Sequence, residues 1–117
     1  MLFNAEIETI FNGFKVNNKD IPVSYMHYEG HEDTYIVYSQ YDTGNSYSTD
    51  DEIAGAVAYY DFDIYSKTNY IAVVKAVKNK LKANNWTWQP NRDSQDFYDN
   101  DTGIYHKTFC FAKPYQE

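Results

Sequence analysis

The chain has 117 residues, a length typical of one domain, and its 43% hydrophobic and 19% aromatic content is too high for a disordered segment. Seventeen acidic against ten basic residues give a formal net charge of −7, which argues against sequence-specific nucleic-acid binding because phosphates are repelled. A single cysteine, Cys110, excludes an internal disulfide, and without a secretion signal or membrane-length apolar run we expect one soluble domain over residues 1–117, made in a reducing cytoplasm.

The N-terminal part of the chain predicts a helix, a turn and two strands. Four apolar side chains recur at helical spacing and predict a short amphipathic helix over residues 2–12: Phe3, Ile7, Ile10 and Phe11. Residues 14–20 are typical of a turn. Residues 23–28 and 35–41 are rich in β-branched and aromatic side chains, which favours strands.

The middle of the chain predicts an exposed segment followed by the longest strand. Residues 42–52 are small, polar and acidic, which is typical of a long loop or hairpin tip that serves contacts rather than packing. Alternation in the strand over residues 53–65 places one set of side chains on a buried face: Ala58, Tyr60, Phe62 and Ile64. Asp61 and Asp63 then lie on the opposite face, so we expect the sheet to be buried on one side only.

A second helix is predicted over residues 70–84. Capping residues precede it in the segment 66–69, and Asn84 with Asn85 forms a left-handed stop. Its apolar stripe consists of Tyr70, Val74, Val77 and Leu81.

The last part of the chain predicts two strands with a turn region between them. Trp86 and Trp88 share one face of a short strand that ends at Pro90, residues 93–101 are polar and acidic, and residues 104–112 form the final strand. The fold class that follows is α+β, a mostly antiparallel sheet with two helices packed on one face.

The histidines and the cysteine do not form a pattern typical of an active site. His27 and His31 stand four apart, but Gly30 disfavours the helix that would aim both rings at one metal. His106 and Cys110 fall on one strand face roughly 13 Å apart, too far for a Cys–His pair.

The carboxylates do not form such a pattern either. The acidic turn before Gly103 does not fit the register of a calcium loop. Asp61 and Asp63 lack the partners of an acid–base pair, and we expect them to form cross-strand ion pairs, for instance to Lys107. We therefore expect no enzymatic activity, no cofactor and no bound metal.

One charge pattern stands out in the second helix. Lys75, Lys78 and Lys82 lie within about 60° of one another on the helical wheel. Lysines late in a helix can complement its dipole and solvate its outer face. The alternative is a basic patch that meets acidic residues of a neighbouring copy. This alternative gives the candidate interface residues: Lys75, Lys78, Lys82, Asp50, Asp51, Glu52, Asp61 and Asp63.

Three segments of the chain carry a family resemblance. They are IPVSYMHYEGHEDTYIVYSQY, then DFDIYSKTNY with its Asp63–Lys67 motif, and FYDNDTGIYHKTFCF with its Asp101–Lys107 motif. In order and spacing they resemble the tail-completion, or tail-terminator, proteins of long-tailed phages and prophages of Gram-positive bacteria. Residues 42–51 match no motif of that family.

The resemblance implies a fold similar to lambda-type tail terminators and a structural role in the virion. Such a protein completes the tail tube and joins it to the head connector as a homohexameric ring, assembled in the host cytoplasm. The implied partners are further copies of the chain, the tail tube protein and the head–tail connector proteins. DNA would pass an acidic lumen without specific binding, and no membrane partner is expected.

Three alternatives to tail completion remain open at the level of sequence. One is a head-side neck or minor capsid component. Another is an acidic monomeric inhibitor that mimics DNA and blocks a host enzyme. The third is a module that binds a small ligand or a divalent ion through the histidine or aspartate clusters.

Overall fold

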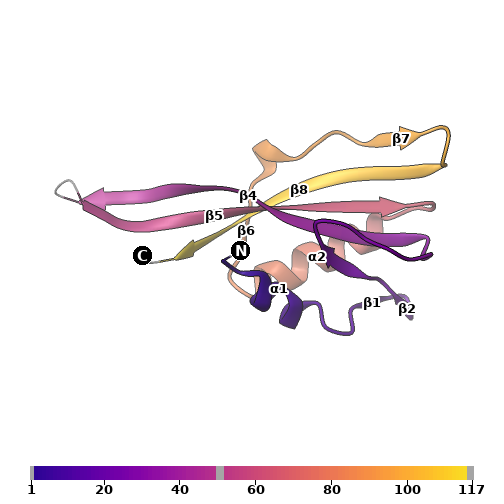
Figure 1. The fold of residues 1–117 in the computed structure, drawn as a ribbon, viewed down its shortest axis with the longest axis horizontal. Coiled ribbons are helices and arrows are strands. Elements are labelled where there is room, and N and C mark those ends of the chain that lie inside the picture. The colour runs from indigo at the N-terminus through magenta and orange to yellow at the C-terminus, as the bar shows by residue number, and fades with distance from the viewer. Residues whose placement is uncertain (1, 50–51, 116–117) are drawn as a thin grey trace.

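A central sheet carries the fold, and the helices α1 and α2 both lie on one side of it (Figure 1). The structure is a computed structural model that describes residues 2–49 and 52–115. Its elements in chain order are α1 (Asn4–Ile10), β1 (Lys15–Val16), β2 (Lys19–Asp20), β3 (Val23–Tyr25), β4 (Thr34–Thr49), β5 (Glu52–Ser66), α2 (Ile71–Ala83), β6 (Thr87–Trp88), the 3-10 helix η1 (Pro90–Arg92), β7 (Phe97–Asp99) and β8 (Ile104–Tyr115).

The strand order in the sheet is β3-β4-β5-β8-β6, with β7 paired to one end of β8. The pair β3–β4 is parallel and the other pairings of the described sheet are antiparallel. The expected α+β class with a mostly antiparallel sheet is therefore confirmed. No helix in the described part of the chain combines the length and apolarity needed to cross a membrane.

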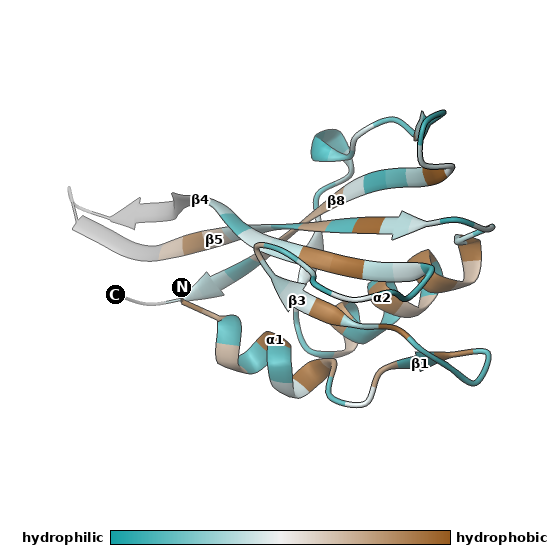
Figure 2. Cartoon of the chain, turned by 45° about the vertical axis from the view of Figure 1, so that its right-hand side comes forward, coloured by the Kyte–Doolittle hydropathy of each residue, from teal (hydrophilic) through white to brown (hydrophobic). Residues whose placement is uncertain are grey.

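The core lies between the sheet and the two helices. Hydrophobic residues, brown in Figure 2, recur along β4, β5 and α2 with polar residues between them. As expected from the alternation in β5, four of its side chains are fully buried: Ala58, Tyr60, Phe62 and Ile64. Ile7 and Ile10 of α1 pack into the same cluster. Trp86 belongs to the same cluster. Its indole N–H donates to Glu6 Oε2 at 2.7 Å, and this hydrogen bond links α1 to the segment after α2.

Helix α2 ends as expected, but its buried stripe is rotated. Asn85 has a φ of 68°, and the N–H of Trp86 donates to the carbonyl of Leu81 at 2.9 Å, which completes a Schellman motif. The buried face consists of Val73, Val77 and Leu81, so Val73 replaces the predicted Val74. Val74 is half-buried because it faces a groove between α2 and β8.

Near the N-terminus the predicted turn is present within a short hairpin, whereas the predicted end of the next strand is wrong for a backbone reason. The segment 14–20 forms the hairpin β1–β2, in which Asn17 and Asn18 take φ values of 53° and 66°, as a type I′ turn requires. The strand predicted over residues 23–28 stops at Tyr25, because Met26 takes a left-handed φ of 71°.

The segment 42–52, expected as a long loop or a hairpin tip, is largely strand. β4 continues to Thr49 and β5 begins at Glu52, with three irregularities in their pairing register. The described part of this segment, residues 42–49 and Glu52, thus belongs to a long hairpin whose strands project beyond the rest of the sheet (Figure 1).

The face of the sheet opposite the helices is partly covered, contrary to expectation. The segment from Gln89 to Ser94 follows the edge of β8, and the backbone N–H of Gln89 donates to the carbonyl of Cys110. Arg92 lies 4.1 Å from the ring centre of Tyr59, across that face. Cys110 is fully buried there, so the sheet is not open on its whole second side.

Candidate interaction site

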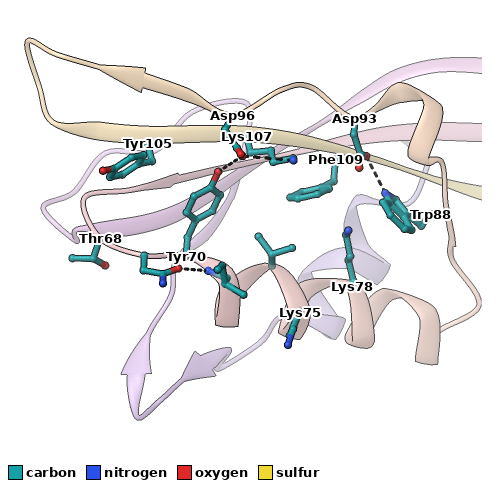
Figure 3. A pocket seen from close by; sticks show the side chains of 13 residues that line it. Thr68, Tyr70, Lys75, Lys78, Trp88, Asp93, Asp96, Tyr105, Lys107 and Phe109 are labelled. Atoms are coloured by element: carbon teal, nitrogen blue, oxygen red, sulfur yellow. Dashed lines mark hydrogen bonds and ion pairs between the residues drawn. The ribbon is translucent and has the colours of Figure 1, made fainter.

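A groove of about 830 Å³ runs between α2 and the edge of β8 (Figure 3). The first turns of α2 form one wall, β8 forms the floor, and the segment that leads into β7 forms the other wall. Its lining includes Tyr70, Ile71, Lys75, Lys78, Trp88, Asp93, Asp96, Tyr105, Lys107 and Phe109.

Lys78 lies at the end of the groove formed by Trp88 and Phe109 (Figure 3). Its ammonium lies 3.5 Å from the ring centre of Trp88 and 4.4 Å from that of Phe109. Both distances are within the range of cation–π contacts. Burial lowers the pKa of the Lys78 ammonium, Asp93 opposes this effect, and the positive charges of Lys107 and Lys82 add to it.

The carboxylates of the groove are already engaged within the chain. Asp93 Oδ1 accepts a hydrogen bond from the Trp88 indole N–H at 2.9 Å. Asp96 Oδ1 accepts one from the Tyr70 hydroxyl and lies 3.6 Å from Lys107 Nζ. The Tyr70 hydrogen bond lowers the pKa of Asp96, while burial and then Asp96 raise the pKa of Tyr70 to about 12.

The free charge of the groove is therefore positive. Within residues 2–49 and 52–115, Lys75 and Lys78 lie in no ion pair. Figure 3 shows Lys78 directed toward Trp88 and Phe109, whereas Lys75 sits at the rim with its ammonium turned away from the floor. Two apolar side chains on the rim are exposed as well: Ile71 by 59% and Tyr105 by 40%.

Of the three lysines expected to act together, two line the groove and the third lies near the same tryptophan ring. Lys78 lies inside the groove and Lys75 at its rim, while the Lys82 ammonium lies 5.6 Å from the ring centre of Trp88 and the residue does not line the groove. Among the expected acidic interface residues, Asp50 and Asp51 lie outside the described residues. Glu52 begins β5 at the end of the long hairpin.

Asp61 and Asp63 lie on the opposite face of the sheet and have partners within the chain. The Thr108 hydroxyl donates to Asp63 Oδ1, and His106 Nε2 lies 3.3 Å from the same oxygen. Asp61 is opposite Cys110 in the register of β5 and β8. Burial raises the pKa of Asp61, and the charge of Asp63 raises it further.

The expected ion pair of Asp61 or Asp63 with Lys107 is wrong. Lys107 points to the helix face, because its neighbours His106 and Thr108 occupy the other face of β8. Its ammonium lies close to Asp96 instead.

The two short motifs noted in the sequence are neighbours in the sheet. Asp63–Lys67 lies at the end of β5 and the segment 104–107 at the start of β8, with Tyr65 opposite His106 and Ser66 opposite Tyr105. Ser66 is fully buried, and its hydroxyl lies 2.7 Å from that of Thr34. These motifs therefore have a structural role, since they join the ends of three strands.

The sequence did not predict that Trp88, Phe109 and Asp96 lie beside helix α2 and its lysines. Trp88 belongs to β6 and Phe109 to β8, so only the packing of α2 on these strands places both rings beside Lys78. One signal in the sequence could have indicated this contact. It is a lysine on the face of α2 that packs toward the strand containing Trp88.

Among the candidates for catalysis or metal binding, His27, His106 and Cys110 lie beside carboxylates in the structure. His27 is exposed beside Glu29, with 3.6 Å between His27 Nε2 and Glu29 Oε1. Cys110 is buried against Asp61, and burial followed by that carboxylate raises the pKa of its thiol to about 12. In the described residues, no three His, Cys, Asp or Glu side chains are grouped so that they could hold a metal ion.

Comparison of the sequence with protein-family models and with curated proteins finds no match.

Proposed function

We propose that this chain is a self-assembling structural protein of a phage virion, which completes the tail tube and joins it to the head connector as a ring of six copies. The carrying observation is the long β4–β5 hairpin, which leaves strand edges available for another protein chain. The resemblance of three segments to tail-completion proteins supports the specific role.

The end of this hairpin extends past its neighbours in the sheet. β8 accompanies β5 only as far as the pair Ala56–Tyr115, and β3 accompanies β4 only as far as Tyr38. Among the described residues, Glu52–Gly55 therefore pair with β4 alone. We call residues 46–55 the arm; its positions 50 and 51 lie outside the described residues.

A projecting two-stranded arm is unfavourable in an isolated molecule. Two strands alone are at best marginally stable in water, and an unpaired edge exposes a row of backbone N–H and C=O groups. Among the described residues, the outer edge of β4 pairs with no strand from residue 42 to residue 49. Contact with another protein chain would satisfy these groups, either by added strand pairing or by packing against the arm.

The longest dimension of the chain is consistent with a role in assembly. The molecule extends 53 Å along its longest axis and 28 Å and 23 Å along the others. A projecting arm at one end lets each subunit reach a neighbour, as a ring with heterologous contacts requires. The net charge of −7 would keep DNA from binding to the wall of such a ring.

Light scattering across a concentration series tests self-assembly. We expect the mass to rise from the 13.7 kDa monomer toward six times that value, with rings visible by electron microscopy. In the matched variant, Asn-Gly replaces residues 46–55 and joins Asn45 to Ala56, which face each other in the register. This variant should keep the circular dichroism of the folded protein but remain a monomer.

Tail completion is tested with the tail tube protein encoded by the same genome. Gold-labelled chain should bind one end of assembled tubes and stop their growth. A wild-type chain that stays monomeric at all concentrations and leaves tube growth unchanged would contradict the proposal and favour the monomeric inhibitor.

A further inference from the structure

We propose that the groove beside α2 receives the arm of a second copy, with the acidic tip of that arm placed against Lys78. This inference rests on the proposed function, because it names the contact that would close the ring. Three observations carry it: the charge of the groove, its exposed apolar rim and the positions of arm and groove in the chain.

The arm carries negative charge, whereas the unpaired charge of the groove is positive. In sequence its tip carries Asp50, Asp51 and Glu52. The groove offers the ammonium group of Lys78, with Lys75 at its rim, whereas its own carboxylates already accept hydrogen bonds from Trp88 and Tyr70. An incoming carboxylate therefore meets positive charge without displacing an existing ion pair of Lys78 within the described residues.

The groove also fits the apolar part of the arm. Ile53 follows the three acidic residues in the sequence, and Tyr47 precedes them. The rim of the groove exposes Ile71 and Tyr105, and its volume of about 830 Å³ is sufficient for several side chains. Burial of Ile71 and Tyr105 by a partner would remove exposed apolar surface from water.

The arm and the groove lie at opposite ends of β5, so one copy cannot satisfy its own groove. β5 runs from Glu52 at the arm to Ser66, and α2 begins five residues later with the groove along its first turns. Fifteen strand residues extend roughly 45 Å. A contact between the arm of one copy and the groove of the next is heterologous, the type that generates a closed ring or an open filament.

Charge reversal in the full-length chain tests this contact. Lys78→Glu and the arm variant Asp50→Lys/Asp51→Lys should each lose self-association, with at least a tenfold rise in the concentration at which oligomers form. An equimolar mixture of the two variants should recover oligomers, because the acidic groove then meets the basic arm and the remaining wild-type groove meets the wild-type arm. Lys19→Glu makes the same charge change outside the groove and should assemble normally.

Binding is also measurable without assembly. A synthetic peptide of residues 46–55, added to dilute full-length protein, should change the fluorescence of Trp88 with a saturable dependence. The signal should disappear in Trp88→Phe, which retains buried Trp86, and binding should weaken at least tenfold in Lys78→Met, which keeps the aliphatic stem of the side chain.

The outcomes separate this inference from the proposed function. If Lys78→Glu folds and still forms rings like the wild type, or if the mixture recovers nothing, the groove contact is wrong although ring assembly stands. If the wild type never self-associates, ring assembly fails, and absence of peptide binding to the folded monomer would overturn the groove contact as well.

Discussion

The ring of Tyr65 lies flat against the ring of His106, with 4.3 Å between their centroids and 7° between their planes. The stack continues from Tyr65 to Tyr35 and on to Tyr28 at centroid distances of 5.0 Å and 4.5 Å. Aromatic side chains thus cross β8, β5 and β4 on the face opposite the helices. Cross-strand aromatic contacts of this kind stabilise a sheet where no helix covers it.

Asp63 contacts His106, the last ring of this stack, through its carboxylate. We predict that Asp63→Ala lowers the free energy of unfolding by about 1–3 kcal/mol, because it removes an acceptor shared by the Thr108 hydroxyl and His106. Chemical denaturation at pH 7 measures the change. A variant as stable as the wild type would show that these hydrogen bonds contribute nothing net.

Asp61 is predicted to respond in the opposite direction. Its folded-state pKa is raised by burial and by Asp63, so ionisation of Asp61 disfavours the folded state once the pH exceeds the unfolded value of 3.8. Asp61→Asn should therefore be more stable than the wild type at pH 7. The difference should shrink as the pH falls through the raised pKa, when both side chains are neutral.

Stability curves of the two proteins between pH 3 and pH 8 test this prediction. A difference that stays constant over this range, or an Asn variant that is less stable at pH 7, would show that contacts of the ionised carboxylate with its neighbours outweigh its burial.

Asn85 is a position where glycine should stabilise the protein. Its φ of 68° is left-handed, a conformation that costs less for glycine than for residues with a Cβ. We predict that Asn85→Gly raises the free energy of unfolding by ~0.5 kcal/mol. Asn79→Gly, the same change inside α2, should instead lower it by a few tenths of a kcal/mol, about the difference in helix propensity. Thermal unfolding distinguishes the two signs, and equal effects would contradict the C-terminal stop.

Cys110 should be unreactive in the folded protein. Its side chain is fully buried, and burial together with Asp61 raises the pKa of the thiol to about 12, so almost no thiolate exists at pH 8. We predict that a thiol-specific reagent labels native protein only at the rate of unfolding and labels denatured protein at once. Tyr98→Cys, at an exposed site, is the matched control and should react immediately. Rapid labelling of the native wild type would place the thiol at the surface.

Local sequence patterns were sufficient to predict the elements in which apolar residues recur with a single helix or strand period. The alternation in β5 identified the buried set from Ala58 to Ile64, since strand side chains switch faces at each residue. The span and the left-handed stop of α2 also followed from the sequence, because both depend on residues within one helix.

The extent of β4 and β5 did not follow from local patterns. Residues 42–49 are mostly small and polar, and they form a strand because each pairs with or lies beside a residue of β5, a contact that local propensity does not encode. The rotation of the α2 stripe has a similar cause. Val73 rather than Val74 is buried, since the crossing of α2 over the sheet selects which side chains face it.

The sequence by itself determined the composition of this protein's surfaces: an acidic chain, three lysines near one another on a helix and acidic residues at positions 50–52. Only the tertiary structure decided that Lys78 lies between Trp88 and Phe109 while the arm projects from the other end of β5. The physical reason is that charge and periodicity are properties of neighbouring residues. The groove, by contrast, is formed by α2, β6 and β8, which meet only when the core closes.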